Sequence, residues 1–247
     1  KGRESFVEHA LLNIQILGKF SLAYQDNHVD DSGDRSRKVW LLLAYLIYHR
    51  NRPVTQDELL ELLHIKEGAN PSGALKTTLH RVRNLLDGLF PSAGHELILY
   101  KNGSYQWSQD YPVQMDHEDF EVLCRRASAE TDPTQQLELR LQACQLFRGD
   151  FLGKLSAEAW VVPICAYYHN LYLQNVLAAL PELQAQQRHE DIVQLCRDAI
   201  LLEAYQEEFY QIQMQSLIQL GEQKQAVTLY EDLARLLLND FGTMPDE

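Results

Sequence analysis

An Asn-Gly pair at residues 102 and 103 restricts the fold of this chain more than any other feature. It stands between two β-rich segments, and two consecutive residues that tolerate positive φ predict a two-residue type I′ turn. Such a turn fixes the register of an antiparallel hairpin. The predicted cross-strand pairs are Tyr100 with Tyr105 and Ile98 with Trp107. The hairpin therefore has an apolar face that must pack on another element.

Three predicted helices precede this hairpin. Residues 35–51 carry apolar side chains at helical spacing. Thr55, followed three residues later by Glu58, forms a capping box and predicts a short helix over 56–63. A third helix is predicted over 72–87. Three helices followed by a hairpin is the order of a winged helix-turn-helix, which inserts its third helix into the major groove of DNA.

The third predicted helix has two contrasting faces. Its buried stripe is expected to comprise Leu75, Leu79, Val82 and Leu86. The opposite face carries hydrogen-bonding side chains that suit the edges of bases, namely Thr77, His80, Arg81 and Asn84. Lys76 and Arg83 flank that face, where a phosphate backbone would run. The alternative is a solvated polar face, which most surface helices have.

Charge is unevenly distributed along the chain. Residues 1–110 carry 13 basic and 13 acidic side chains, whereas the remainder carries 9 basic and 22 acidic ones and accounts for the net charge of −13. Residues 72–107 alone have a net charge of +2. A uniformly acidic protein would repel nucleic acid. A neutral half joined to an acidic half instead favours two modules with different partners.

After a polar stretch at 108–116 the chain is predicted to be entirely helical. A weak repeat of about 34 residues, the period of tetratricopeptide units, relates Ile192, Val193 and Leu195 to Ala226, Val227 and Leu229. We therefore predict a mainly α protein. An N-terminal winged helix-turn-helix with small β elements is expected over 1–110, and an all-α tetratricopeptide-like repeat domain over 111–247.

Several kinds of site are not expected. The histidines are scattered without metal-ligand spacing, no phosphate-binding glycine loop is complete, and no catalytic triad can be assembled, so we predict no enzyme, metal or cofactor. No apolar run is long enough for a bilayer span, and the four cysteines lack CxxC pairing, which favours a cytoplasmic protein with reduced thiols. Tyr168 and Tyr172 share a helical stripe and either pack in the core or line a ligand groove.

The sequence also resembles a known family. "PVTQDELLELL" and "ALKTTLHRVRNLL" are similar to the middle and recognition helices of the OmpR/PhoB-type winged helix, and "ILGKFSLAY" resembles the β-start of SARP-type activators. The second half is similar to the bacterial transcriptional activator domain. That similarity is carried by "MDHEDFEVL" with Asp116 and Phe120, "LFRGDFL", Trp160 and "AVTLYEDLARLLLNDFGTMP". The matching segments run in order from about residue 11 to residue 245.

The resemblance implies roles for individual residues. Thr77, His80, Arg81 and Asn84 would face the major groove, Lys76 and Arg83 would contact phosphate, and Lys101, Asn102 and Ser104 would lie in the wing tip. The family wing usually ends in Gly-Tyr, whereas this one has Ser104-Tyr105, and the positions of His80 and Asn84 more often carry other residues. Fewer positive charges imply weaker phosphate anchoring, so tight binding would call for a homodimer or a partner.

Two functional hypotheses follow. In the first, the chain is a sequence-specific transcriptional regulator, an activator, that binds double-stranded DNA and uses its helical repeats for dimerisation, for an effector or for contact with RNA polymerase. In the second, it is a protein-interaction scaffold whose winged helix no longer binds DNA. Since the sequence lacks an initiator Met, the natural chain is expected to extend beyond it with additional domains, and whether these are receiver or ATPase domains is left open.

Overall fold

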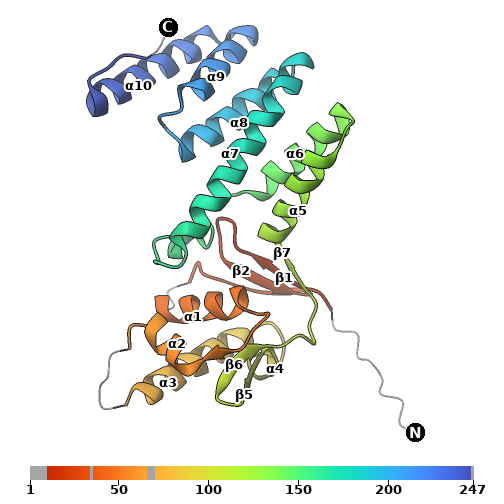
Figure 1. Cartoon of the computed structure of the whole chain (residues 1–247), viewed down its shortest axis with the longest axis vertical. Helices are drawn as coiled ribbons and strands as arrows, with labels where there is room; N and C mark the ends of the chain where they lie inside the picture. The colour runs from red at the N-terminus through yellow and green to blue at the C-terminus, as the bar shows by residue number, and fades with distance from the viewer. Residues whose placement is uncertain (1–9, 34–35, 66–69, 246–247) are drawn as a thin grey trace. The chain divides into compact units, whose positions relative to one another are not determined.

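The computed structural model describes residues 10–33, 36–65 and 70–245. It divides into two compact units. Unit 1 comprises Lys1–Glu118 and Arg148–Val162, and unit 2 comprises Asp119–Phe147 and Pro163–Glu247. The predicted fold class, with a β/α part followed by helices alone, is confirmed (Figure 1). A functional division at residue 110 stays a prediction.

Four short strands form the first sheet of unit 1. They are β1 (Leu12–Gln15), β2 (Ser21–Tyr24), β3 (Asn27–Asp30) and β7 (Val113–Met115), in the order β3-β2-β1-β7. Strands β1, β2 and β3 pair antiparallel, and β7 pairs parallel to β1. Alternation along β1 buries Leu12 and Ile14, while Asn13 and Gln15 face outward. This sheet therefore has one core-facing side.

The three predicted helices of unit 1 are present. The described helices are α1 (Arg37–Tyr48), α2 (Gln56–Leu62), α3 (Pro71–Leu86) and the short α4 (Ala93–Leu97), which was not predicted. The first helix was expected to start at residue 35, which lies outside the described residues. The capping box of α2 is confirmed, since Thr55 Oγ1 accepts from Glu58 N at 3.2 Å and Glu58 Oε2 accepts from Thr55 N at 2.9 Å.

The hairpin predicted from the Asn-Gly pair is confirmed. Strands β4 (Val54–Thr55), β5 (Ile98–Lys101) and β6 (Ser104–Trp107) form a second sheet in the order β4-β6-β5. Asn102 and Gly103 have φ values of 51° and 79°, as a type I′ turn requires. The ladder pairs Tyr100 with Tyr105 and Ile98 with Trp107. Ile98 and Trp107 are buried, so this face completes the core of the winged helix.

A segment from the second half of the sequence, Arg148–Val162, also belongs to unit 1. Phe151 forms an isolated antiparallel bridge with Leu17, and Leu152 N donates to Ile16 O at 2.8 Å. The approach is close enough that a Cβ on Gly153 would overlap the carbonyl of Gly18. Further along the segment, the Trp160 ring lies with its centroid 5.3 Å from that of Tyr45 and 5.5 Å from that of Tyr48. The sequence analysis had placed this segment in the helical domain.

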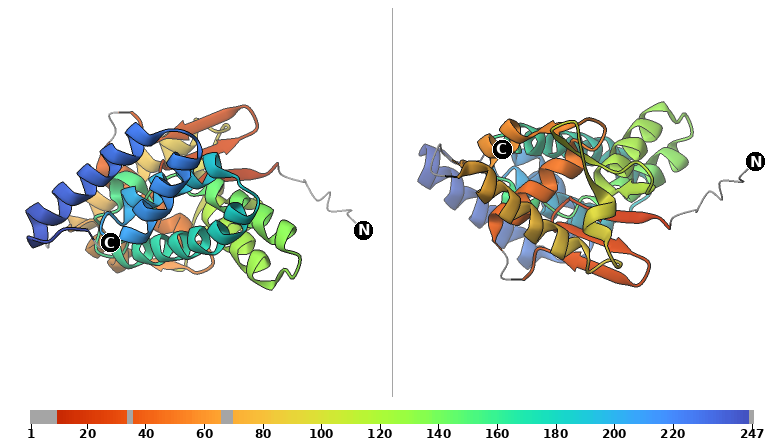
Figure 2. Two further views of the ribbon diagram at one scale, coloured as in Figure 1. Left: turned by 90° about the horizontal axis from the view of Figure 1, so that it is seen from above. Right: turned by 90° about the horizontal axis from the view of Figure 1, so that it is seen from below.

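Unit 2 is built from helices. They are α5 (Asp116–Ala129), whose first residues belong to unit 1, α6 (Pro133–Leu146), α7 (Val162–Ala185), α8 (His189–Leu202), α9 (Glu207–Gln219) and α10 (Gln223–Phe241). Helices α8, α9 and α10 pack in sequence order, and both views show α10 alongside α9 (Figure 2). None of the helices in the described residues is long and apolar enough to cross a membrane.

The predicted repeat describes two of its three residue pairs well. Ile192 and its counterpart Ala226 are both buried. Leu195 is buried, and its counterpart Leu229 is partly buried. Val193 is 8 % exposed, whereas its counterpart Val227 is 57 % exposed. The difference has a simple cause. Helix α9 covers Val193, but in the described residues no helix follows α10 to cover Val227.

Candidate nucleic-acid interface

The candidate interface is the outward face of α3. Its opposite side is anchored in the core of unit 1 by Leu75, Leu79, Val82, Leu85 and Leu86, all of them buried. Thr77, His80, Arg81 and Asn84 are exposed together, as the helical wheel predicted. The structure adds Leu85 to the buried stripe and starts the helix slightly earlier than expected. The Asn70 side chain caps it by accepting from Gly73 N at 2.8 Å.

The polar side chains on this face are partly engaged with one another. Thr77 Oγ1 donates to Gly73 O at 2.9 Å, which leaves its methyl group and oxygen lone pairs for an outside partner. One turn apart, His80 Nε2 and Asn84 Nδ2 lie 3.2 Å from each other. That bond holds the amide and the imidazole in a fixed relation. The pair therefore offers a partly ordered polar surface rather than two independent rotamers.

Arg81 is the most available hydrogen-bond donor of the face. Its side chain is exposed and makes no hydrogen bond or ion pair with the described residues. It lines a shallow hollow of about 280 Å³ beside the start of α1, together with Ser36, Val39, Asn84 and Leu85. A guanidinium in this position is free to make the bidentate contact that reads guanine.

Arg83 has a different environment from Arg81. Its Nη2 donates to Ile98 O at 3.0 Å, and its Nε is buried without a hydrogen-bond acceptor among the described residues. The α3 backbone at this residue is also in close contact with Gly94, where a Cβ would overlap the Arg83 Cα. Arg83 thus joins α3 to β5 and α4, a contact that the helical wheel did not predict. Its phosphate contact stays a prediction.

The wing presents a basic tip and an aromatic side chain. Lys101 and Asn102 are exposed, and Ser104 is half-buried opposite Thr55 in the ladder. Tyr100 was predicted to lie opposite Tyr105 on the apolar, packing face of the hairpin. Its ring is half-exposed beside Tyr105, with centroids 4.8 Å apart, and its hydroxyl accepts from Gln56 Nε2 at 2.6 Å. Tyr100 shares its face of the ladder with the buried Ile98, but it lies next to the turn, where the core no longer covers it.

The basic residues of α3 and the wing form no ion pair among the described residues, whereas several other basic residues of unit 1 do. Lys19, Arg37, Arg50 and Arg52 each pair with a carboxylate, their partners being Asp30, Glu158, Glu118 and Glu58. Lys38, Lys76, Arg81, Lys101, Arg148 and Lys154 are exposed and have no such partner among the described residues, although Lys154 donates to the backbone oxygen of Asp31. Three of these six lie on α3 or the wing. Positive charge without a carboxylate partner is therefore present where a winged helix contacts DNA, even though the chain as a whole is acidic.

Tyr168 and Tyr172, the predicted ligand-groove residues, both lie in the core of unit 2. Tyr168 donates from its hydroxyl to Glu121 Oε1 at 2.7 Å. Tyr172 stacks on Phe147 with ring centroids 4.5 Å apart, and burial raises the pKa of its phenol. Their positions agree with the packing alternative. A ligand groove at these residues stays a prediction.

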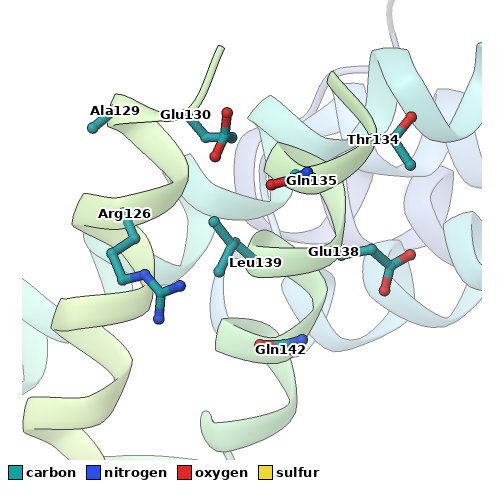
Figure 3. A pocket seen from close by; sticks show the side chains of 8 residues that line it. All are labelled: Arg126, Ala129, Glu130, Thr134, Gln135, Glu138, Leu139 and Gln142. Atoms are coloured by element: carbon teal, nitrogen blue, oxygen red, sulfur yellow. The ribbon is translucent and has the colours of Figure 1, made fainter. Parts of the chain in front are cut away.

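An open groove of about 460 Å³ lies elsewhere in unit 2, between α5 and α6 (Figure 3). Figure 3 shows Leu139 pointing into the space between the two helices. The groove is lined by Arg126, Ala129, Glu130, Thr134, Gln135, Glu138, Leu139 and Gln142. Its walls mix both signs of charge with amides, and the described residues contain no cluster that could hold a metal ion. The groove therefore resembles ordinary helix-hairpin surface more than a built site.

Comparisons with known proteins bear on both halves. The family model "Bacterial transcriptional activator domain" matches residues 115–247. Among solved structures, Mycobacterium tuberculosis EmbR in complex with a low-affinity phosphopeptide is similar in fold, with a TM-score of 0.64 and 18 % sequence identity. The match covers 95 % of this chain and 62 % of the EmbR chain. No curated protein matches the sequence significantly.

Proposed function

Since the chain belongs to the bacterial transcriptional activator domain family, we propose that it is a DNA-binding transcriptional regulator whose α3 reads the major groove. The family is one of transcriptional activators and not of enzymes. The finer statement, that α3 reads the bases, is supported by one observation above the others. Arg81 stands exposed and unpaired at the centre of a polar face whose opposite side is locked in the core.

In the proposed complex, different residues have different tasks. Arg81 donates to a base edge, and the His80–Asn84 pair and Thr77 contact neighbouring bases. Lys76 and the wing residues Lys101, Asn102 and Ser104 contact phosphate and set the register of the helix on the duplex. Arg83 keeps α3 and β5 together, and any phosphate contact that it makes is additional to this role.

The acidic helical unit supplies the regulatory half of the proposal. Its surface is unsuited to nucleic acid, so its partners are proteins, among them RNA polymerase or a second copy of the chain. This assignment is supported by the family match and by the charge asymmetry between the two halves of the sequence.

Selection of bound sequences from a random pool of double-stranded DNA tests the proposal. We expect an enriched motif, and fluorescence anisotropy with that motif should show that Arg81→Ala loses about 1–3 kcal/mol of specific binding. Random DNA should be bound nearly equally by both proteins. Lys76→Ala should weaken binding to all sequences and reduce the salt slope by about one.

Arg197→Ala is the matched control, because it removes an exposed arginine from unit 2. It should leave DNA affinity unchanged. A pool without any enriched motif, together with equal anisotropy curves for wild type and Arg81→Ala, would favour the scaffold hypothesis instead.

A further inference from the structure

Helix α10 carries an apolar stripe that the described residues leave uncovered. Val227, Tyr230, Leu238 and Phe241 are 57 %, 43 %, 56 % and 60 % exposed, and Ala234 lies between them, partly buried. At 100° per residue these five fall on one face, next to the face that Leu233 and Leu237 bury against α9. Contiguous exposed apolar side chains of this kind mark interaction surfaces.

The spacing of the stripe identifies the geometry of its partner. Measured from Ala234, the four large side chains lie at −7, −4, +4 and +7. The pattern is a palindrome. If a second α10 lies antiparallel across a two-fold axis at Ala234, Val227 meets Phe241 and Tyr230 meets Leu238, twice each. A small residue at the crossing point lets the two backbones approach closely.

Charges beside the stripe fit the same arrangement. Glu231 and Arg235 lie on the flank of the stripe that faces away from α9, at about +60° and +100° from Ala234. In an antiparallel pair like flanks meet, so Glu231 of each copy comes within a turn of Arg235 of the other. Arg235 is 69 % exposed, and its contact with Asp232 within the helix is 3.3 Å long, so it can reorient toward a partner.

We propose that α10 is a homodimerisation helix, which pairs antiparallel with α10 of a second copy about a two-fold axis at Ala234. The contact face runs from Val227 to Phe241, about 21 Å of helix. Tyr205, whose ring packs on Phe241 with centroids 5.0 Å apart, extends it at one end. Since one helix face is smaller than a standard stable interface, dissociation in the micromolar range is expected. The proposal does not depend on DNA binding.

Analytical ultracentrifugation of the 247-residue chain is the first test. The weight-average mass should rise from monomer toward dimer between about 1 and 100 µM. Leu238→Glu buries a charge in the interface and should weaken association at least about ten-fold. Leu201→Glu is the matched control, because Leu201 is 80 % exposed on α8 and outside the stripe. A chain that stays monomeric throughout, or equal loss in both variants, would overturn the proposal.

Cysteine cross-linking tests the axis and direction, and the four native cysteines are buried. Ala234→Cys should form a disulfide dimer on mild oxidation. Val227→Cys alone should not, because the two copies of that residue lie at opposite ends of the contact, but mixed with Phe241→Cys it should cross-link. A strong Val227→Cys homodimer would mean parallel helices and contradict the proposed arrangement.

Charge exchange gives an independent test of register. Glu231→Arg and Arg235→Glu should each weaken association, whereas the double variant should recover most of it, because the pairs re-form with reversed sign. A double variant weaker than both single variants would refute the register. Arg81→Ala should leave the mass unchanged, which separates failure of this inference from failure of the proposed DNA binding.

Discussion

Leu17 pairs with Phe151 across an antiparallel β-bridge, and both side chains are fully buried in unit 1. Two backbone hydrogen bonds flank the bridge, from Gly18 N to Asp150 O and from Leu152 N to Ile16 O. The Phe151 ring also packs edge-on against Tyr48 of α1, with centroids 5.7 Å apart. A segment from the second half of the sequence thus closes the core of the winged-helix unit.

Truncating Phe151 should therefore destabilise unit 1. Phe151→Ala removes a fully buried ring that packs against Tyr48 of α1 beside the bridge to Leu17, and we expect a loss of about 3–5 kcal/mol in the free energy of unfolding. Urea denaturation followed by tryptophan fluorescence measures it, since Trp40 and Trp107 both lie in the core of this unit. Met244→Ala, at an exposed site, should change little. A loss below about 1 kcal/mol would mean that the segment is only loosely docked.

The capping box of α2 should give a pH-dependent contribution to stability. The backbone hydrogen bond from Thr55 lowers the pKa of Glu58, with help from Arg52 at 2.9 Å. Because the folded-state pKa lies below the unfolded one, the stabilisation is complete above the unfolded value and is lost as the pH falls through the folded value. Glu58→Gln should therefore be less stable than wild type at pH 7, by about 1 kcal/mol or less, and equal to it in acid.

Unfolding free energies from urea titrations between pH 7 and the acid range check this pH dependence. Glu61→Gln, on the exposed side of the same helix, is the control and should behave like wild type throughout. A stability gap that stays constant with pH would show that the ionised carboxylate of Glu58 is not the source.

Substitution of Arg81 should weaken DNA binding without changing stability, whereas substitution of Arg83 should lower stability. Arg81→Ala changes an exposed side chain without partners, so the free energy of unfolding should stay within about 0.5 kcal/mol of wild type. Arg83→Ala breaks the contact with Ile98 O and should cost about 1–3 kcal/mol. Thermal unfolding measures the stability of both variants, and their DNA affinities are measured in parallel. The reverse order of stabilities would contradict the placement of the two side chains.

The cysteines should be unreactive in the native protein. All four are buried, and burial raises the pKa of Cys124 to about 11 and those of Cys144 and Cys196 to about 12. Since the thiolate is the reactive form, a chromogenic disulfide reagent at pH 8 should titrate almost no thiol before unfolding and four after it. Rapid reaction of one or more thiols in the native protein would show that a helix of unit 2 opens.

Local chemistry explains which features of the fold could be predicted. The Thr55–Glu58 capping box and the Asn102–Gly103 turn each depend on a few residues that are adjacent in the sequence, and both were predicted with their partners. The outward face of α3 followed from helical periodicity in the same way. Each of these depends on contacts within a few residues or across a single turn.

Long-range packing explains what could not be predicted. The Arg83 contact with Ile98 depends on the packing of α3 against β5, and the bridge of Leu17 to Phe151 joins residues from opposite halves of the sequence. Neither has a local signature. The motif "LFRGDFL" resembled a family, yet nothing in its composition indicated that Phe151 bridges to Leu17 and packs on Tyr48 of α1.

The course of the chain through unit 1 also has a consequence for its synthesis. Residues up to 118 cannot complete their core on the ribosome, because Phe151 and Trp160 are translated only after the first helical hairpin of unit 2. At ~5–20 residues per second, the interval from residue 118 to residue 162 lasts about 2–9 s. During this interval Leu17 lacks its contact with Phe151, and Tyr48 lacks its contacts with Phe151 and Trp160. Maturation of the winged helix is thereby tied to translation well into the helical half, so that a chain interrupted earlier leaves unit 1 unfinished.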